Sequence, residues 1–162
     1  MKKTAQNKKG FTLIEILTVL AIIGVLSAVV LVSMSSYGPK ARSAKVHSMA
    51  SSAIPAMISC WGNTDNSGNP AKVSDPTKVV NICNLGASYG AWPVFSGDLS
   101  NYSYVATDVN IDNAVGKRSS QWAFSVESIS SSDNKKICCN STMNGCKISA
   151  AGTTCTYNNP AN

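Results

Sequence analysis

Apolar residues are concentrated close to the N-terminus of the chain. Residues 16–34 contain no charged side chain, and Glu15 carries the only charge between Phe11 and Met34. A run of about twenty such residues is long enough to cross the hydrocarbon core of a bilayer as a helix. Because a backbone in lipid must satisfy its own hydrogen bonds, the segment should be helical throughout. The pattern therefore predicts a membrane helix with a carboxylate near its N-terminal end.

A second helical pattern follows the membrane segment. Residues 35–39 contain glycine and proline side by side, as Gly38 and Pro39, which predicts a kink or a short irregular stretch there. Apolar residues then recur at spacings of three and four, while serines and Pro55 take the opposite face. The apolar stripe consists of Val46, Met49, Ala50, Ala53, Ile54, Met57 and Ile58. We expect this stripe to pack on a globular domain, and the glycine and asparagine after Trp61 suit a helix C-terminus.

The rest of the chain has the pattern of a small β-sheet preceded by an irregular connection. Glycine, asparagine, proline, serine and aspartate recur in residues 62–100, where only 78–83 and 92–95 have the pattern of short extended pieces. This connection is a candidate subunit contact surface. Alternating side chains then predict strands, which lie at residues 102–107, 121–127, 135–139 and 146–149. An antiparallel sheet of three or four strands across a long N-terminal helix is an α+β fold.

The positive charge of the chain is concentrated in its first ten residues. Four lysines (Lys2, Lys3, Lys8 and Lys9) precede the apolar run, so that the formal charge of +6 falls to about +2 without these ten residues. The remaining basic residues form no stripe, so charge alone gives no support for nucleic-acid binding, and a nucleic-acid partner is left undecided. Basic residues that flank a membrane helix stay in the cytoplasm, so the C-terminal part should lie outside.

A cleaved secretory signal peptide is the alternative interpretation of the N-terminus, because it also begins with basic residues followed by an apolar stretch. The apolar run here is longer than the core of a typical signal peptide. Neither Ser27–Ala28 nor residues 33–36 provide a clear cleavage site of small residues. We therefore prefer a segment that stays in the membrane.

The residues at the start of the apolar run resemble those of a known family. Lys8-Lys9-Gly10, then FTLIE and about twenty apolar residues, are similar to the class III leader and helix of bacterial type IV pilins and type II secretion pseudopilins. The resemblance implies that a prepilin peptidase cuts between Gly10 and Phe11 on the cytoplasmic side and methylates the new Phe11 amine. Glu15 would then be the fifth residue of the mature chain.

The same resemblance implies a pilin-like α+β fold, with a long helix that spans the inner membrane first and forms the filament core later. Together with the residue pattern, it gives these predicted segments: a leader (1–10), a membrane and filament-core helix (11–37), an amphipathic helix (38–61), an irregular connection (62–100) and a disulfide-stabilised sheet head (101–162). The last two segments rest on the residue pattern alone. Gly24 falls where members often carry a helix-loosening glycine, and Val32 stands where many members have proline.

The resemblance further implies a structural subunit and not an enzyme. A type IV pilus-like subunit would insert in the inner membrane as a single-pass protein with its C-terminus outside, and then form a homo-oligomeric helical filament at the cell surface. Its partners would be the prepilin peptidase, an inner-membrane assembly platform and, before assembly, membrane lipid. A pseudopilin of a type II secretion or DNA-uptake system is the alternative, because it shares every N-terminal feature. We can place no catalytic motif in the sequence and expect no cofactor.

Glu15 is the residue that we expect to direct assembly. A carboxylate in a membrane helix is costly and usually has both a partner and a function. No Lys, Arg or His lies within one turn, and Thr12 and Thr18 offer only hydroxyl groups, so we place the partner outside this helix. The candidate is the Phe11 amine that cleavage creates on a neighbouring subunit. The alternative is a Glu15 that lies at the membrane interface and extends its side chain into water.

Six cysteines point to disulfides in an oxidising compartment. They are Cys60, Cys83, Cys138, Cys139, Cys146 and Cys155, and six cysteines allow fifteen connectivities among which sequence alone does not choose. We expect Cys60 to pair with Cys83 and the last four to pair among themselves, for example Cys139 with Cys146 and Cys138 with Cys155. A bond between the adjacent pair would be strained. Zinc is the alternative, but no Cys-x-x-Cys occurs and the only histidine lies in the predicted helix.

One acidic pattern has part of the form of a calcium loop. Asp108, Asn110 and Asp112 have the alternating spacing of calcium ligands, but Asn113 replaces the required glycine and Ser119 replaces the bidentate glutamate. We therefore favour turn chemistry here and keep calcium as a secondary interpretation.

Four further residues have structural explanations. His47 has no acidic or nucleophilic neighbour in a motif, so we expect a solvated or capping side chain. Trp61, Trp92 and Trp122 are expected in the core or at an interface.

Overall fold

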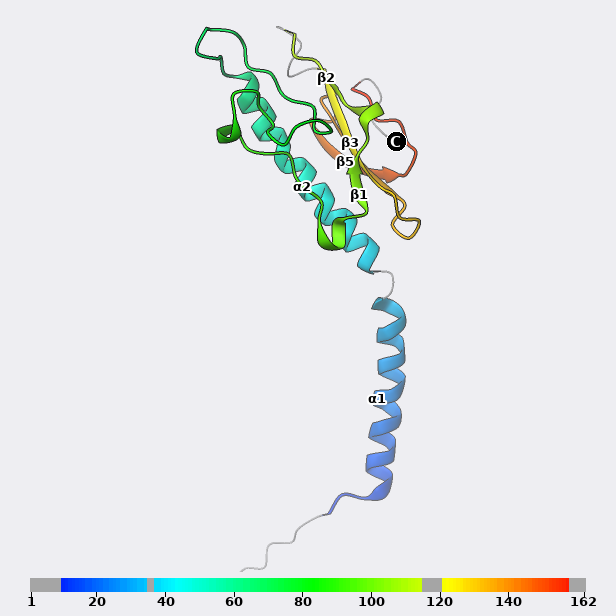
Figure 1. Ribbon diagram of the computed structural model, residues 1–162. Coiled ribbons are helices and arrows are strands. Elements are labelled where there is room, and N and C mark those ends of the chain that lie inside the picture. The colour runs from blue at the N-terminus through cyan, green and yellow to red at the C-terminus, as the bar shows by residue number, and fades with distance from the viewer. Residues whose placement is uncertain (1–9, 35–36, 115–120, 158–162) are drawn as a thin grey trace, which may run out of the picture. The chain divides into compact units, whose positions relative to one another are not determined.

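The computed structural model describes residues 10–34, 37–114 and 121–157 (Figure 1). Its contacts divide the chain into two compact units, Met1–Gly38 and Pro39–Asn162. The leader before Gly10 and the step from Ser35 to Ser36 lie outside the described residues.

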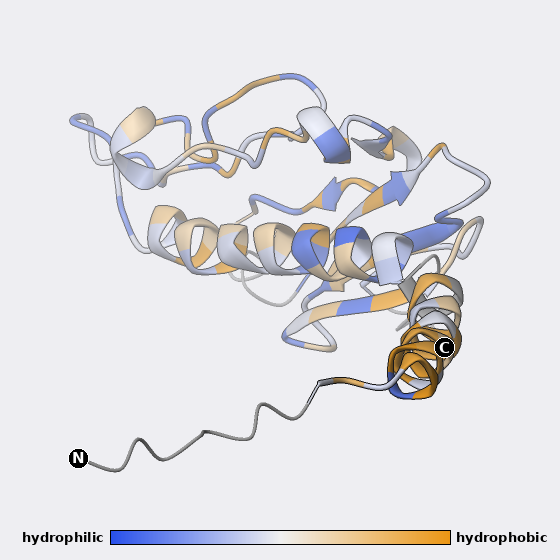
Figure 2. Cartoon of the chain, turned by 90° about the horizontal axis from the view of Figure 1, so that it is seen from below, coloured by the Kyte–Doolittle hydropathy of each residue, from blue (hydrophilic) through white to orange (hydrophobic). Residues whose placement is uncertain are grey.

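α1 is an uninterrupted apolar helix of 22 residues, Leu13–Met34. Its segment Leu13–Leu31 is long and apolar enough to cross a membrane, and Figure 2 shows hydrophobic colouring along most of the helix. Gly24 and Val32 both lie inside α1. The glycine therefore does not break the helix, and valine in place of proline keeps a backbone donor at position 32.

α2 spans Tyr37–Trp61 and therefore begins before the glycine–proline pair. Of the stretch 35–39, in which we predict a kink or an irregular segment, Ser35 and Ser36 lie outside the described residues. Gly38 and Pro39 lie in the first turn of α2, so the helix is not broken at these two residues. Proline is tolerated there because the first four N–H groups of a helix have no partner within the helix. Pro55 lies inside α2 on the exposed side, as predicted.

The buried face of α2 follows most of the predicted stripe, in which Met49 is partly buried against the core and Ile58 is exposed. The buried residues are Ser43, Val46, Ala50, Ala53, Ile54, Met57, Cys60 and Trp61. Ile58 is 49% exposed, so its assignment to the stripe is wrong. Because 3.6 residues complete a turn, each four-residue step rotates the side chain by about 40°. The steps from Ala50 through Ile54 therefore carry Ile58 out of the buried stripe.

Five strands form one antiparallel sheet in the head. They are β1 (Tyr102–Tyr104), β2 (Asn110–Ile111), β3 (Trp122–Ser128), β4 (Lys135–Asn140) and β5 (Gly145–Ala150). The order is β1-β3-β4-β5, and β2 also pairs with β3. We did not predict β2, because two residues are too few to show alternation. The helix followed by the sheet is the α+β, pilin-like arrangement that the sequence predicts.

A short helix, η3 (Ala106–Asp108), interrupts one edge of the sheet. β1 and β2 both pair with β3, with Tyr104 opposite Val126 and Asn110 opposite Ala123. The chain between the two strands is longer than the stretch of β3 it faces, so it bulges. The prediction that the first strand continues to residue 107 is therefore wrong. The bulge brings the carboxylate of Asp108 inward, where Oδ2 accepts a hydrogen bond from Ser125 Oγ at 2.7 Å.

Both faces of the sheet are covered. Phe124 and Val126 join α2 in the main core. Ala123 and Ser125 alternate with them on β3 and therefore point to the other face, yet both are 0% exposed. A second buried cluster of Ala123, Cys138 and Cys155 brings the C-terminal segment onto this outer face.

The irregular connection contains no strand among its described residues. The two predicted extended pieces, 78–83 and 92–95, are therefore not strands. Isolated bridges instead join Val73 to Cys83 and Asn81 to Ala91. Two short helices, η1 (Ala87–Tyr89) and η2 (Gly97–Leu99), complete the connection.

Three disulfides cross-link the head: Cys60–Cys83, Cys138–Cys155 and Cys139–Cys146. These are the pairings that we preferred from the sequence. The first ties the end of α2 to the irregular connection, the second attaches the C-terminal segment to β4, and the third joins β4 to β5. The head therefore has covalent cross-links on both faces of its sheet.

Polar contacts fix α2 against the sheet at two further points. Nε and Nη2 of Arg42 donate to the two carboxylate oxygens of Asp133 at 3.0 and 2.8 Å, and Asp133 lies in the turn before β4. The pair raises the pKa of the Arg42 guanidinium. His47 Nε2 lies 2.9 Å from the carbonyl oxygen of Cys146. His47 is thus a contact between α2 and β5, not a solvated side chain.

Candidate processing and assembly site

The predicted cleavage position lies in an accessible stretch of chain. Gly10, Phe11 and Thr12 precede α1 and have no helical structure, and Phe11 is 83% exposed. A Cβ added at Gly10 would meet nothing within 4 Å. The packing of this chain therefore does not require glycine at position 10. If glycine is required at this position, the requirement comes from a partner such as a processing enzyme.

Thr12 and Glu15 form a capping box at the start of α1. The backbone N–H and the hydroxyl of Thr12 both donate to Glu15 Oε2 at 2.8 Å. The backbone N–H of Glu15 points back to Thr12 Oγ1 at 3.4 Å. Thr12 occupies the N-cap position and Glu15 the third helical position, which is the spacing of a capping box. The arrangement fixes the Glu15 side chain against the first turn.

The capping box adds a contact that we do not predict from the sequence. Thr12 binds one carboxylate oxygen of Glu15, and a charged partner outside this helix stays a prediction. The signal was present, because Thr12-x-x-Glu15 is a capping-box sequence. Both bonds end on Oε2, and among the described residues we find no hydrogen bond to Oε1. Thr12 lies after the predicted cut, so its contact with Glu15 is retained in the processed chain.

The apolar surface of α1 extends the site along the helix from Leu13 to Leu31. Its large apolar side chains are exposed, for example Leu13 at 78% and Val29 at 65%. A contiguous apolar surface of this extent marks a contact with membrane or protein. Glu15 is the single charge in this surface.

Comparison with known families bears on this N-terminal segment. A family model that describes the prokaryotic N-terminal methylation motif matches residues 5–31. The chain carries the class III prepilin leader. This motif of type IV pilins and pseudopilins implies processing by a prepilin peptidase and assembly of the pilus type. No curated protein and no solved structure matched the chain. The match covers the second part of the leader and most of α1, and the head lies outside it.

The residues of the secondary calcium interpretation have contacts within the chain. Asp108 binds Ser125 and Lys136 through Oδ2, and Oδ1 of Asp112 accepts the backbone N–H of Ala114 at 2.8 Å, as in a turn. In the part of the chain that is described, no group of three or more His, Cys, Asp or Glu side chains could hold a metal ion. Asn110 lies in the short strand β2. Calcium binding at these three residues stays a prediction.

Asn113 has a role that the sequence did not reveal. Its Oδ1 accepts hydrogen bonds from Trp61 Nε1 at 3.0 Å and from the Val73 N–H at 2.9 Å. Its Nδ2 donates to the Val73 carbonyl at 3.0 Å. One amide side chain thus joins the end of α2, the irregular connection and the segment after β2. No local pattern signals such a residue, because its partners are distant in sequence.

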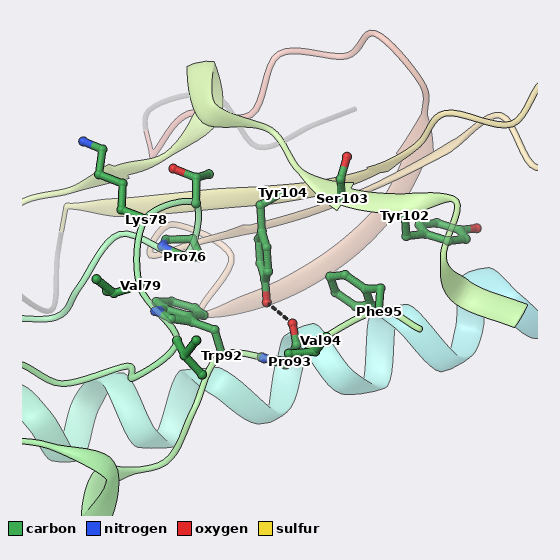
Figure 3. A pocket seen from close by; sticks show the side chains of 12 residues that line it. Pro76, Lys78, Val79, Trp92, Pro93, Val94, Phe95, Tyr102, Ser103 and Tyr104 are labelled. Carbon is green, nitrogen blue, oxygen red and sulfur yellow. Dashed lines mark hydrogen bonds between the residues drawn. The ribbon is translucent and has the colours of Figure 1, made fainter. Parts of the chain in front are cut away.

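The head also has a shallow apolar hollow that we did not predict (Figure 3). Trp92, Phe95 and Tyr104 form its aromatic wall, and the Tyr104 hydroxyl donates to the Pro93 carbonyl at 3.2 Å. Lys78 is the one charged residue of the lining that the structure describes. The hollow therefore offers apolar contact and little charge.

Proposed function

We propose that this protein is the structural subunit of a type IV pilus-like filament. Prepilin peptidase cuts after Gly10 and methylates the amine of Phe11. Before assembly, the subunit stays inserted in the inner membrane as a single-pass protein with its head outside. An assembly platform moves it into a homo-oligomeric filament at the cell surface.

The observation that carries this proposal is the methylation motif joined to an exposed apolar helix with a single charge. Lipid covers the apolar surface of α1 before assembly, and the α1 helices of other subunits cover it afterwards. Glu15 pairs with the Phe11 amine of a neighbouring subunit in the filament. Thr12 holds Oε2 of Glu15, while Oε1 accepts no hydrogen bond among the described residues, and this second oxygen is the one that we assign to an incoming amine.

Replacement of Glu15 by glutamine separates its charge from its capping function. Glutamine also completes a capping box, but it cannot form an ion pair with an amine. Glu15→Gln and Glu15→Ala should both be processed and inserted normally while filament yield falls at least tenfold. The measurements are the intact mass of the membrane-extracted subunit and the yield of sheared filaments, counted by electron microscopy. Glu15→Asp, which keeps the charge, should retain part of the yield.

The outcomes distinguish the roles of Glu15. Wild-type-like filament yield from Glu15→Gln would defeat the charge pairing and leave only the cap. A subunit mass that still includes the leader in the wild type would defeat the processing step. Short fibres confined to the cell envelope at native expression, with no surface filaments, would favour a pseudopilin over a pilus subunit.

A further inference from the structure

A group of charged side chains is buried on the outer face of the head sheet. Lys136 Nζ lies 2.6 Å from Asp108 Oδ2 and 3.2 Å from Glu127 Oε2. The side chain of Lys136 is 4% exposed, that of Asp108 7% and that of Glu127 23%. A lysine is thus enclosed between two carboxylates and almost shielded from water.

The fold holds each member of this group in place. Glu127 on β3 and Lys136 on β4 are direct cross-strand partners, and η3 brings in Asp108 from the bulged edge. Ser125 Oγ donates to Asp108 Oδ2 at 2.7 Å. The backbone N–H of Gly152 donates to Glu127 Oε1 at 2.8 Å. The amine, both carboxyl groups and a hydroxyl therefore meet on elements that the sheet and its edge hold together.

Stability alone is a poor explanation for this group. A buried ion pair often contributes less than apolar residues of the same volume, because the desolvation of both charges offsets their attraction. Here a single ammonium faces two carboxylates, so the group also has an unbalanced negative charge. A site poor in water favours the reaction that removes charges from it.

We propose that Lys136 and Asp108 join in an intramolecular amide bond between Nζ and Cγ, with Glu127 as the proton-transfer residue. This cross-link is independent of the proposed filament function. The ammonium of Lys136 first gives a proton to the Asp108 carboxylate, which leaves an amine and a carboxylic acid. The lone pair of Nζ then attacks Cγ and forms the new C–N bond.

The remaining steps release one water molecule. Glu127 takes a proton from the attacking nitrogen and passes it to the departing hydroxyl group of Asp108. The electron pair of the broken C–O bond leaves with that oxygen as water, and Glu127 returns to its starting state. Ser125 donates a hydrogen bond to Oδ2 and so holds the Asp108 carboxyl group in place beside Nζ. The net change is one ammonium and one carboxylate converted to an amide and water, with no oxidant or reductant.

The product would be a covalent link between η3 and β4 that reducing agents do not open. The three disulfides of the head can be reduced. The amide would therefore retain one cross-link on the outer face of the sheet in a fully reduced chain.

Mass spectrometry of the full mature chain tests the proposal. The protein is extracted from membranes in detergent, reduced, denatured and weighed. The wild type should be lighter than its calculated mass by one water molecule. Trypsin should fail to cut after Lys136, and tandem spectra should show the peptides of Asp108 and Lys136 joined. A wild-type chain of full mass, cut normally after Lys136, would establish an ordinary ion pair and overturn the proposal.

Matched variants assign the roles. Glu127→Gln keeps the oxygen that accepts the Gly152 N–H but removes proton transfer. This variant should therefore form no amide and should have its full calculated mass. Lys136→Arg should also have full mass, whereas Lys135→Arg, at the exposed neighbouring position, should lose water like the wild type. Intact disulfides in each variant report that the head has folded. Water loss that maps to any other pair of residues would contradict the bond between Asp108 and Lys136. Unchanged bond formation in Glu127→Gln would contradict the role of Glu127 in proton transfer.

Discussion

α1 and α2 have similar lengths, 22 and 25 residues, but their apolar side chains are buried by different means. Val46 and Met57 of α2 are 0% exposed because the sheet of the same chain covers them. Leu26 of α1 is 60% exposed. The apolar stripe of α2 is buried for the most part within the subunit, whereas the described large apolar side chains of α1 stay exposed. The difference separates residues that fold the head from residues that, in the proposed function, assemble the filament.

Substitution of one apolar residue in each helix should affect a different property, head stability for α2 and filament yield for α1. This pair of variants is the strongest test of the comparison. Met57→Ala opens a cavity in the core and should lower the unfolding free energy of the head by about 2–5 kcal/mol. Leu26→Ala should leave head stability unchanged and lower filament yield. Tryptophan fluorescence of the detergent-solubilised full chain follows head unfolding, because Trp61, Trp92 and Trp122 all lie in the head core. Equal loss of head stability in both variants would contradict the division.

Removal of the disulfide at the end of α2 should have a somewhat smaller effect. Cys60 and Cys83 join α2 to the irregular connection over a sequence separation of 23 residues. The double variant Cys60→Ala, Cys83→Ala should lower the unfolding free energy by about 3 kcal/mol. Denaturant unfolding of the full chain measures the change, with Leu26→Ala as the control. A head as stable as the wild type would show that packing of the stripe alone holds the end of α2.

The sequence predicts the parts of this protein that depend on neighbouring residues. The uncharged run of α1 and the alternation in β3 are local patterns, and both elements form where expected. The capping box of Thr12 and Glu15 was also readable, because both residues lie in one turn.

The outer face of the sheet was not predictable in the same way. Ser125 and Lys136 appear in the sequence as an ordinary polar position and an ordinary surface charge. They are buried because η3 and the C-terminal segment cover this face of the sheet. Neither segment is a sequence neighbour of Ser125 or Lys136. A lone lysine gives no local signal that two carboxylates will enclose it.

The capping box offers a smaller test of the difference between the helices. Thr12→Ala removes a hydroxyl that binds Glu15 and should lower the stability of the first turn of α1 by about 1 kcal/mol. Processing should be normal, filament yield should fall less than in Glu15→Gln, and head unfolding should be unchanged. Thr12→Ser keeps the hydroxyl and should match the wild type. A greater loss of filaments in Thr12→Ala than in Glu15→Gln would place the cap, not the charge, at the centre of assembly.

Alkaline pH should act on the head and leave α1 unaffected, with the smallest effect. Tyr104 packs against Phe124, and burial raises the pKa of the Tyr104 phenol above its ordinary value. An unfolded tyrosine ionises near pH 10. The contribution of Tyr104 to stability is therefore present in full below about pH 10 and is lost as the pH rises further, because the unfolded chain ionises first.

The slope of head stability above about pH 10 is thus the quantity to measure, by denaturant unfolding at a series of pH values. Tyr104→Phe should show a shallower decline than the wild type. Tyr37→Phe, at an exposed position, should follow the wild type. The only ionisable side chain in α1 is Glu15, which does not change its charge in this range. The helical circular dichroism of α1 in detergent should therefore persist while the head unfolds. An equal slope of head stability in Tyr104→Phe and the wild type would show that groups other than Tyr104 cause the loss of stability at alkaline pH.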